Sequence, residues 1–247
     1  MQNFENELNE YINILFKSEE GIPGRQYLKS RQIKVDTAKY WKLGYCPIGY
    51  IPKCYRGEEN TYPFWEKMWG RLIIPIYDQH GNLVSLSGRM IIKYNDGPKY
   101  DHYKFFTRKV LFGLYQNKQS ITEMNRCIIT EGQMDVISSW QHGLKNVTSS
   151  FGAHGSLTHF AIISRYCNKI DVLYDGDTAG KKGMDAIKDF STYGDLNVNI
   201  VNNIFSNGED LDEWIKKNNP EKLFYKIDKY NENKLKYKLS LMNNKFN

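Results

Sequence analysis

Apolar residues in the second half of the chain alternate between two patterns. Short runs rich in β-branched residues predict four strands: CIIT (127–130), NVTSS (146–150), KIDVLYD (169–175) and LNVNIV (196–201). Segments with helical spacing follow them at 133–142, 155–167, 179–190 and 210–218. Strands that alternate with helices pair in parallel through right-handed crossovers. We therefore expect a doubly wound, mainly parallel α/β sheet over residues 121–218, followed by a helical tail at 219–247 that docks onto it.

The first half has a less regular pattern and predicts a smaller α+β subdomain over residues 1–120. Apolar positions at helical spacing predict a helix over 3–17 and two short helices over 25–44. Residues 71–78 and 83–91 predict two strands, and the turn Gln79 to Asn82 between them indicates a hairpin. The stretch 46–63 is expected to be irregular.

Charge is distributed unevenly between these two halves. Residues 1–120 hold 18 Lys and Arg against 12 Asp and Glu, whereas the remaining residues hold 16 of each, so the net charge of +6 lies in the first half. A basic excess of this kind suits contact with a polyanion backbone. The acidic, amphipathic start does not resemble a signal peptide, and no apolar run reaches the ~18 residues of a membrane span, so we expect a cytoplasmic protein with no membrane partner.

Acidic residues gather after three of the predicted strands. They are Glu131 and Asp135 after the first, Asp175 and Asp177 after the third, and Asp210 and Asp212 after the fourth. Because the carboxyl ends of parallel strands meet at one edge of a sheet, we expect these carboxylates to lie close together. Oxygen ligands without His or Cys favour Mg²⁺ or Mn²⁺. For any single Asp the alternative role is a helix N-cap.

Zinc is not expected, because the four cysteines form no C-x-x-C pair and have no suitable His spacing. They are Cys46, Cys54, Cys127 and Cys167.

Several segments together resemble a known family. IITEGQMDV (128–136), VLYDGDTAGKKG (172–183) and GEDLDEWI (208–215) resemble the Toprim domain shared by DnaG-type primases, topoisomerases and some nucleases. Upstream, WGRLIIPIYDQHGNLVSLSGRMI (69–91), GPKY (97–100) and LFGLY (111–115) resemble the basic subdomain that precedes Toprim in DnaG-type primases. The resemblance covers about residues 20–215.

This resemblance implies a DNA primase core that makes RNA primers on a single-stranded DNA template from ribonucleoside triphosphates. Residues 1–120 would bind template and nucleotide, and 121–218 would be the catalytic Toprim domain. Glu131, Asp175 and Asp177 would be catalytic and, with Asp210 and Asp212, would bind two or more Mg²⁺ or Mn²⁺ ions, while Asp135 would support the acidic cluster. Phosphates would be bound by the basic residues Arg71, Arg89, Lys99, Arg108 and Lys109.

Departures from the family pattern leave other functions open. Family members usually add a zinc ribbon and a helicase-binding domain; without them, this sequence resembles a minimal, phage-like or mobile-element version. A replicative helicase or a separate zinc-module protein is therefore a possible partner. Leu211 stands where the family usually has proline. The alternatives are a Toprim nuclease, and a non-catalytic adaptor that binds DNA or a replication protein.

Overall fold

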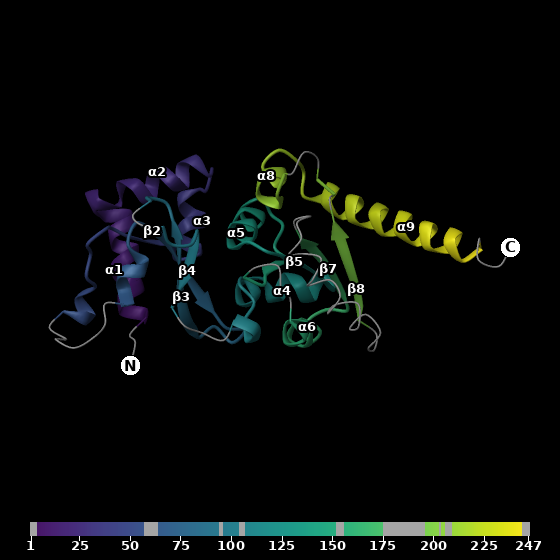
Figure 1. The fold of residues 1–247 in the computed structure, drawn as a ribbon, viewed down its shortest axis with the longest axis horizontal. Coiled ribbons are helices and arrows are strands. Elements are labelled where there is room, and N and C mark those ends of the chain that lie inside the picture. The colour runs from purple at the N-terminus through teal and green to yellow at the C-terminus, as the bar shows by residue number, and fades with distance from the viewer. Residues whose placement is uncertain are drawn as a thin grey trace. The chain divides into compact units, whose positions relative to one another are not determined.

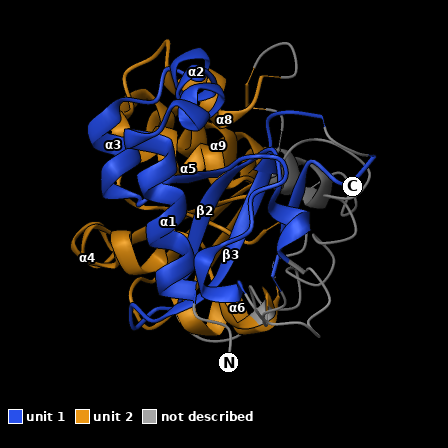
Figure 2. Cartoon of the chain, turned by 90° about the vertical axis from the view of Figure 1, so that its left-hand side faces the viewer, with its two compact units in different colours: residues 1–106 blue, residues 107–247 orange. Residues whose placement is uncertain are grey.

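The computed structural model describes residues 4–56, 64–93, 96–103, 107–151, 156–174, 196–202, 204–205 and 209–243. The chain divides into two units, residues 1–106 and 107–247 (Figures 1 and 2). This division falls before the boundary at residue 120 that the sequence pattern suggested. Among the described helices, no segment combines the length and the apolar character needed to cross a membrane.

The first unit is built on a four-stranded antiparallel sheet in the order β1-β2-β3-β4. Its strands are β1 (Gly44–Cys46), β2 (Arg71–Tyr77), β3 (Leu83–Met90) and β4 (Tyr100–His102). Its helices are α1 (Phe4–Lys17), α2 (Ile22–Ser30) and α3 (Val35–Tyr40), with short 3-10 turns η1 (Glu19–Gly21), η2 (Lys53–Tyr55) and η3 (Phe64–Met68). The predicted helices and the β2–β3 hairpin are confirmed, whereas β1 and β4 were not predicted.

Local chemistry explains the hairpin. The Asp78 carboxylate accepts hydrogen bonds from the backbone N–H groups of His80 and Asn82, both at 2.9 Å, which closes the turn. Pro75 lies within β2, but β1 pairs only with residues 71–73 of that strand. The missing N–H of Pro75 therefore removes no hydrogen bond to β1.

A buried carboxylate joins three parts of the first unit. Glu7 of α1 is fully buried and accepts hydrogen bonds from the hydroxyl groups of Tyr11 at 2.7 Å, Tyr55 at 3.1 Å and Tyr103. Burial raises the pKa of Glu7 above its ordinary value, although the three tyrosine hydrogen bonds oppose the shift. This polar cluster fixes α1 against η2 and the segment that follows β4.

The second unit contains a four-stranded parallel sheet in the order β6-β5-β7-β8 (Figure 1). Its strands are β5 (Arg126–Thr130), β6 (Val147–Ser149), β7 (Lys169–Tyr174) and β8 (Asn197–Asn202). The helical elements are η4 (Thr107–Lys109), α4 (Leu114–Met124), α5 (Gln133–Gln141), α6 (Leu157–Ile163), α8 (Leu211–Ile215) and α9 (Glu221–Asn243). The parallel sheet is confirmed, α4 was not predicted, and the predicted helix at 179–190 lies outside the described residues.

Helix α9 docks onto this sheet through apolar and charged contacts. Leu223 and Ile227 are fully buried, as expected for a tail that packs on the sheet. Arg126 of β5 adds a charged connection: its guanidinium contacts Asp171 of β7 at 2.6 Å and Asp228 of α9 at 2.9 Å. The sequence pattern predicted the apolar docking but not this ion-pair network.

Candidate functional site

The carboxyl ends of β5, β7 and β8 lie along one edge of the parallel sheet. The register pairs Ile129 with Val172 and Tyr174 with Asn202, so the three strands run in the same direction. Glu131 directly follows β5 in this arrangement. In the sequence Asp175 directly follows Tyr174, the last residue of β7, but Asp175 and Asp177 themselves lie outside the described residues.

The loop that carries Glu131 is fastened to the neighbouring strand. The hydroxyl of Ser149, at the end of β6, donates a 2.7 Å hydrogen bond to the carbonyl oxygen of Glu131. The same Ser149 oxygen accepts a hydrogen bond from the N–H of Phe151, whose φ of +62° lies in the left-handed region. Ser149 is fully buried and was not among the predicted site residues. Its signal in the sequence is its position at the end of a predicted strand.

Asp135 connects the loop after β5 to the start of α8. One carboxylate oxygen accepts a hydrogen bond from Gly132 N–H at 3.2 Å, and the other accepts one from Asp212 N–H at 3.3 Å. A Cβ atom added to Gly132 would lie 2.8 Å from the Asp135 carboxylate, so a side chain at this position would displace that carboxylate. Asp135 thus braces two acidic segments that lie 77 residues apart.

The two acidic residues of α8 have structural partners as well. Asp210 is the N-cap of α8 and accepts a 2.8 Å hydrogen bond from Glu213 N–H, which is the alternative role considered for an isolated Asp. Asp212 is fully buried, and its carboxylate lies 2.7 Å from Lys216 Nζ. Leu211, at the first helical position, is buried, so the residue that replaces proline contributes to the core.

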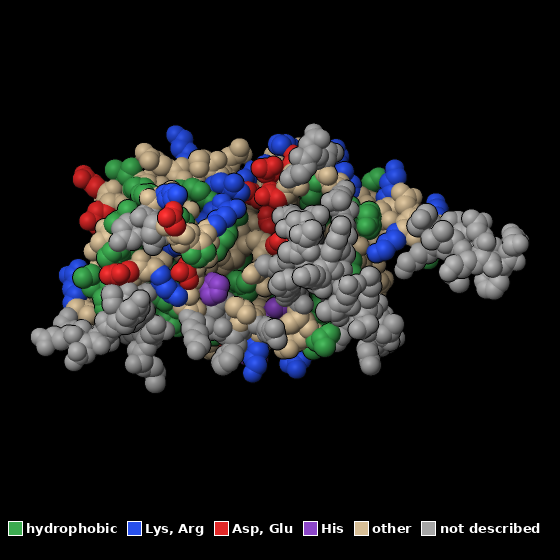
Figure 3. Space-filling model, in the orientation of Figure 1, with side chains coloured by type: hydrophobic (Ala, Val, Ile, Leu, Met, Phe, Trp, Pro, Cys, Tyr) green, Lys and Arg blue, Asp and Glu red, His purple; other side chains and the backbone are tan. Residues whose placement is uncertain are grey.

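Within the part of the chain that the structure describes, no three His, Cys, Asp or Glu side chains lie close enough together to hold a metal ion. The chemistry of the strand ends nevertheless fits a hard divalent cation. The candidate ligands are Glu131 after β5, Asp175 and Asp177 next in the sequence after β7, and Asp210 and Asp212 at the start of α8, and all of them offer carboxylate oxygens. Figure 3 shows acidic side chains of the second unit gathered over the region of α5 and α8.

The predicted basic residues differ in their surroundings. Arg71 is 2% exposed, and its Nη1 donates to the carbonyl oxygens of Gly88 and Pro98 at 3.1 and 2.9 Å, so it holds the sheet of the first unit together. Arg89 is half-buried between the rings of Tyr27 and Tyr100, and it hydrogen-bonds the Tyr100 hydroxyl at 2.5 Å. Their role in phosphate binding stays a prediction.

The remaining basic candidates lie on more open segments. Lys99 and Lys109 are exposed, and the side chain of Arg108 lies outside the described residues. The segment η4, which contains residues 108 and 109, is held by the buried His159 of α6: Nδ1 accepts from Ser156 N–H at 3.2 Å and Nε2 donates to Thr107 O at 2.8 Å. This pattern requires the neutral imidazole, and burial lowers the pKa of His159 accordingly.

Comparison with known proteins identifies relatives of both units. Residues 128–215 match the family described as Toprim-like. The chain is 29% identical over 232 residues to the DNA primase of Aquifex aeolicus (strain VF5), covering 86% of this chain and 45% of that protein. The chain therefore spans less than half the length of this curated relative.

Solved structures give the same picture of the fold. The structure of the DnaG catalytic core matches with a TM-score of 0.77 at 25% identity, over 90% of this chain and 77% of that chain. A DnaG primase catalytic domain bound to single-stranded DNA matches with a TM-score of 0.76 at 24% identity, over 90% of this chain and 78% of that one. The fold of this chain is thus that of the primase catalytic core, as predicted.

Proposed function

We propose that this chain, which carries a Toprim-like domain and is homologous to the catalytic core of DnaG-type primases, joins ribonucleotides into RNA primers on single-stranded DNA. The observation that carries the proposal is the convergence of β5, β7 and β8 at one sheet edge, with acidic residues next in sequence after each strand end or at the following helix. The likeness extends through the antiparallel first unit, and this favours a primase over a Toprim protein with another N-terminal part.

Glu131, Asp175 and Asp177, with Asp210 and Asp212, are the residues that would hold two or more Mg²⁺ or Mn²⁺ ions. Such ions, when bound, stabilise the attacking and leaving oxygens of a phosphoryl transfer. The described residues supply positioning. Ser149 fixes the backbone of Glu131, and Asp135 holds that loop to α8.

Template binding falls to the basic residues in this proposal. The related DnaG domain was solved with single-stranded DNA, and this supports a single-stranded template here. Exposed Lys99 and Lys109 would contact phosphates, and Arg89, held between tyrosine rings, would present a fixed positive charge. We further propose that the protein acts in the cytoplasm and that its partner is a replicative helicase or a separate zinc-module protein.

A synthesis assay tests this function. The protein is incubated with single-stranded DNA, labelled ribonucleoside triphosphates and Mg²⁺ or Mn²⁺. We expect RNA products that lengthen with time, loss of synthesis in Asp175→Asn and Asp177→Asn, and retained DNA binding in both variants. A control with the same charge change, Asp36→Asn, removes an exposed carboxylate of α3 and should leave synthesis unchanged.

Two other outcomes would refute the proposal. Shortened DNA without RNA synthesis would indicate a nuclease that uses the same carboxylates. DNA binding without any product, unaffected by Asp175→Asn, would indicate a non-catalytic adaptor.

A further inference from the structure

Helix α9 carries a basic and aromatic face that the primase site does not use. We propose that this face binds single-stranded nucleic acid outside the active site, either the template strand or the RNA made on it. The α9 stripe, as we call it, consists of Lys222, Tyr225, Lys226, Lys229, Asn233 and Lys236. The binding proposal itself does not require polymerisation, but the identity of the strand rests on the proposed function.

Helical geometry brings these residues to one side. At about 3.6 residues per turn, positions 222, 226, 229, 233 and 236 lie above one another on the same face. The buried residues Leu223 and Ile227 define the opposite, docked face. Since the rise is about 1.5 Å per residue, the lysines from Lys222 to Lys236 span about 21 Å, a length that several nucleotides would cover.

Of the acidic residues in this part of α9, one is paired on the docked side and two are exposed beside the stripe. Over residues 221–236 these are Glu221, Asp228 and Glu232. Asp228 is occupied by Arg126 and Lys169, both at 2.9 Å, on the docked side. Glu221 and Glu232 are exposed and lie beside the stripe, with Glu232 three residues after Lys229 and four before Lys236. The four lysines of the stripe outnumber these two carboxylates, and the net positive charge suits a phosphate backbone.

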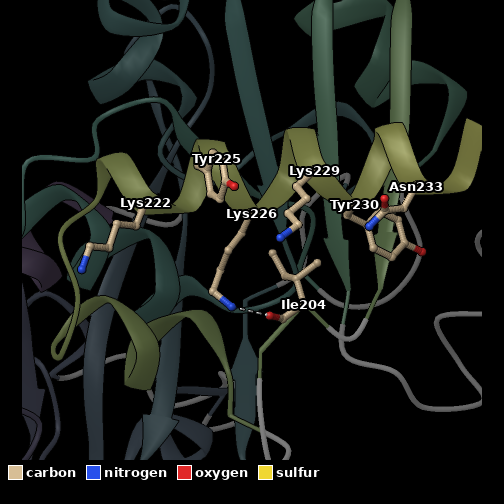
Figure 4. A pocket seen from close by; sticks show the side chains of 7 residues that line it. All are labelled: Ile204, Lys222, Tyr225, Lys226, Lys229, Tyr230 and Asn233. Carbon is tan, nitrogen blue, oxygen red and sulfur yellow. Dashed lines mark hydrogen bonds between the residues drawn. The ribbon is translucent and has the colours of Figure 1, made fainter.

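A hollow lies between the stripe and the segment that follows β8. It has a volume of about 600 Å³ and is lined by Ile204, Lys222, Tyr225, Lys226, Lys229, Tyr230 and Asn233. Figure 4 shows Lys226 and Lys229 directed from neighbouring turns of α9 toward Ile204, and Lys226 Nζ donates to the Ile204 carbonyl at 3.1 Å. The hydrogen bond holds one lysine in place at the base of the hollow.

Aromatic side chains favour a single strand over a duplex or an acidic protein segment. Tyr225 is 68% exposed, and the Lys229 ammonium lies 5.9 Å from the centre of its ring. Stacking of a base on an exposed tyrosine ring is favourable. Unpaired bases offer a free face for this stacking, whereas paired bases within a duplex do not. An acidic protein segment would need the lysines but not the ring.

Binding of fluorescein-labelled dT₂₀ and rU₂₀ to the full chain, followed by fluorescence anisotropy without metal or nucleotides, tests the proposal. The stripe variant Lys222→Gln/Lys229→Gln/Lys236→Gln leaves Lys226 and its hydrogen bond intact. We expect its affinity to fall on the order of tenfold at low salt, and its slope of log affinity against log salt to shrink by about 2, at ~0.7 for each lost phosphate contact. Replacing the same three lysines by arginine should preserve binding.

A matched control separates the stripe from general charge. Lys118→Gln/Lys145→Gln/Arg165→Gln removes the same charge from other elements of the second unit and should leave affinity within about twofold. Tyr115 on α4, with Lys118 4.9 Å from its ring centre, is the counterpart of Tyr225. Tyr225→Ala should weaken single-strand binding at least about fivefold, and Tyr115→Ala should not.

The outcomes are decisive in either direction. Equal loss in both triple variants, or no loss in the stripe variant, would overturn the proposal. So would displacement of dT₂₀ by poly(L-glutamate) as readily as by unlabelled dT₂₀, with no effect of Tyr225→Ala, which would indicate an acidic protein partner. Selective loss for dT₂₀ assigns the stripe to template, and selective loss for rU₂₀ assigns it to product. At saturating template the stripe variant should still make RNA; absence of RNA from the unmodified protein would refute the primase function and leave the binding result standing.

Discussion

Replacing Arg126 should destabilise the second unit far more than replacing its exposed partner. Its side chain is 11% exposed and lies 2.6 Å from Asp171, which is completely buried. Arg126→Met removes the guanidinium, whose carbon lies 4.7 Å from the centre of the Phe224 ring. Among the described residues, Asn199 Nδ2 at 3.1 Å then remains as a donor to the Asp171 carboxylate. Breaking a buried ion pair from one side costs about 3–5 kcal/mol, because the remaining charge stays desolvated.

The second partner provides an internal comparison. Asp228 is 46% exposed, so Asp228→Asn should cost only about 0–1 kcal/mol despite its 2.9 Å contact with the same guanidinium. The double variant Arg126→Met/Asp171→Asn removes both buried charges and should be more stable than Arg126→Met alone. Hydrogen exchange of the β5 and β7 amides, measured as a function of urea concentration, gives the differences in free energy of unfolding between these variants. Equal costs for Arg126→Met and Asp228→Asn, or a double variant less stable than the single one, would refute the reasoning.

Three further predictions concern other buried contacts. The pKa of Glu7 is raised in the folded protein, so its contribution to the stability of the first unit is complete below its ordinary pKa and is lost as pH rises through the folded pKa. Glu7→Gln should remove this pH dependence. Urea midpoints that vary with pH in the same way for both proteins would contradict the prediction. Gly44→Ala places a Cβ 2.6 Å from Tyr11 Cβ and 2.9 Å from the Tyr11 backbone carbon, whereas the Cβ of Gly24→Ala lies 2.7 Å from the flexible end of Leu15. Gly44→Ala should therefore lower the melting temperature more, at a cost of about 1–3 kcal/mol. The reverse order of the two melting temperatures in calorimetry would be inconsistent with this packing. Asp135→Ala removes the acceptor for two backbone N–H groups, so it should lower the free energy of unfolding by about 1–2 kcal/mol and reduce primer synthesis. Asp135→Asn should have a smaller effect on both. Full synthesis and unchanged stability of the alanine variant would show that these hydrogen bonds are dispensable.

Strong periodicity made most of the second unit predictable. The runs CIIT and KIDVLYD contain enough β-branched residues to be recognised as strands, and the segments beside them have regular helical spacing. The parallel direction of the strands then follows from the rules for strand–helix–strand connections. The strands β1 and β4 have three residues each, too few for a period of two to stand out, and they exist because β2 and β3 offer hydrogen-bonding edges. Tertiary pairing, and not local preference, decides such strands.

Polar burial was the hardest feature to predict. Asp171 sits within an apolar run, and only the register that pairs β5 with β7 brings it beside Arg126. Arg71 starts a strand and looks like a surface charge in the sequence, yet the structure places its guanidinium against backbone carbonyls of the adjoining segments. Both cases depend on partners many residues away, to which hydrophobic patterning carries no signal.

The acidic edge illustrates how one sequence signal combines two physical roles. Like charges at one edge repel, and the protein offsets part of that repulsion itself: Asp210 faces the N–H groups at the start of α8, Asp135 accepts two backbone N–H groups, and Asp212 is paired with Lys216. These three carboxylates thereby fix the loop that carries Glu131 and the start of α8, although Asp210 and Asp212 are also among the proposed metal ligands. A residue whose charge is already compensated by the protein gains less from a cation than one whose charge is not. The proposed metal requirement should therefore depend less on Asp210 and Asp212 than their place in the acidic cluster of the sequence suggests.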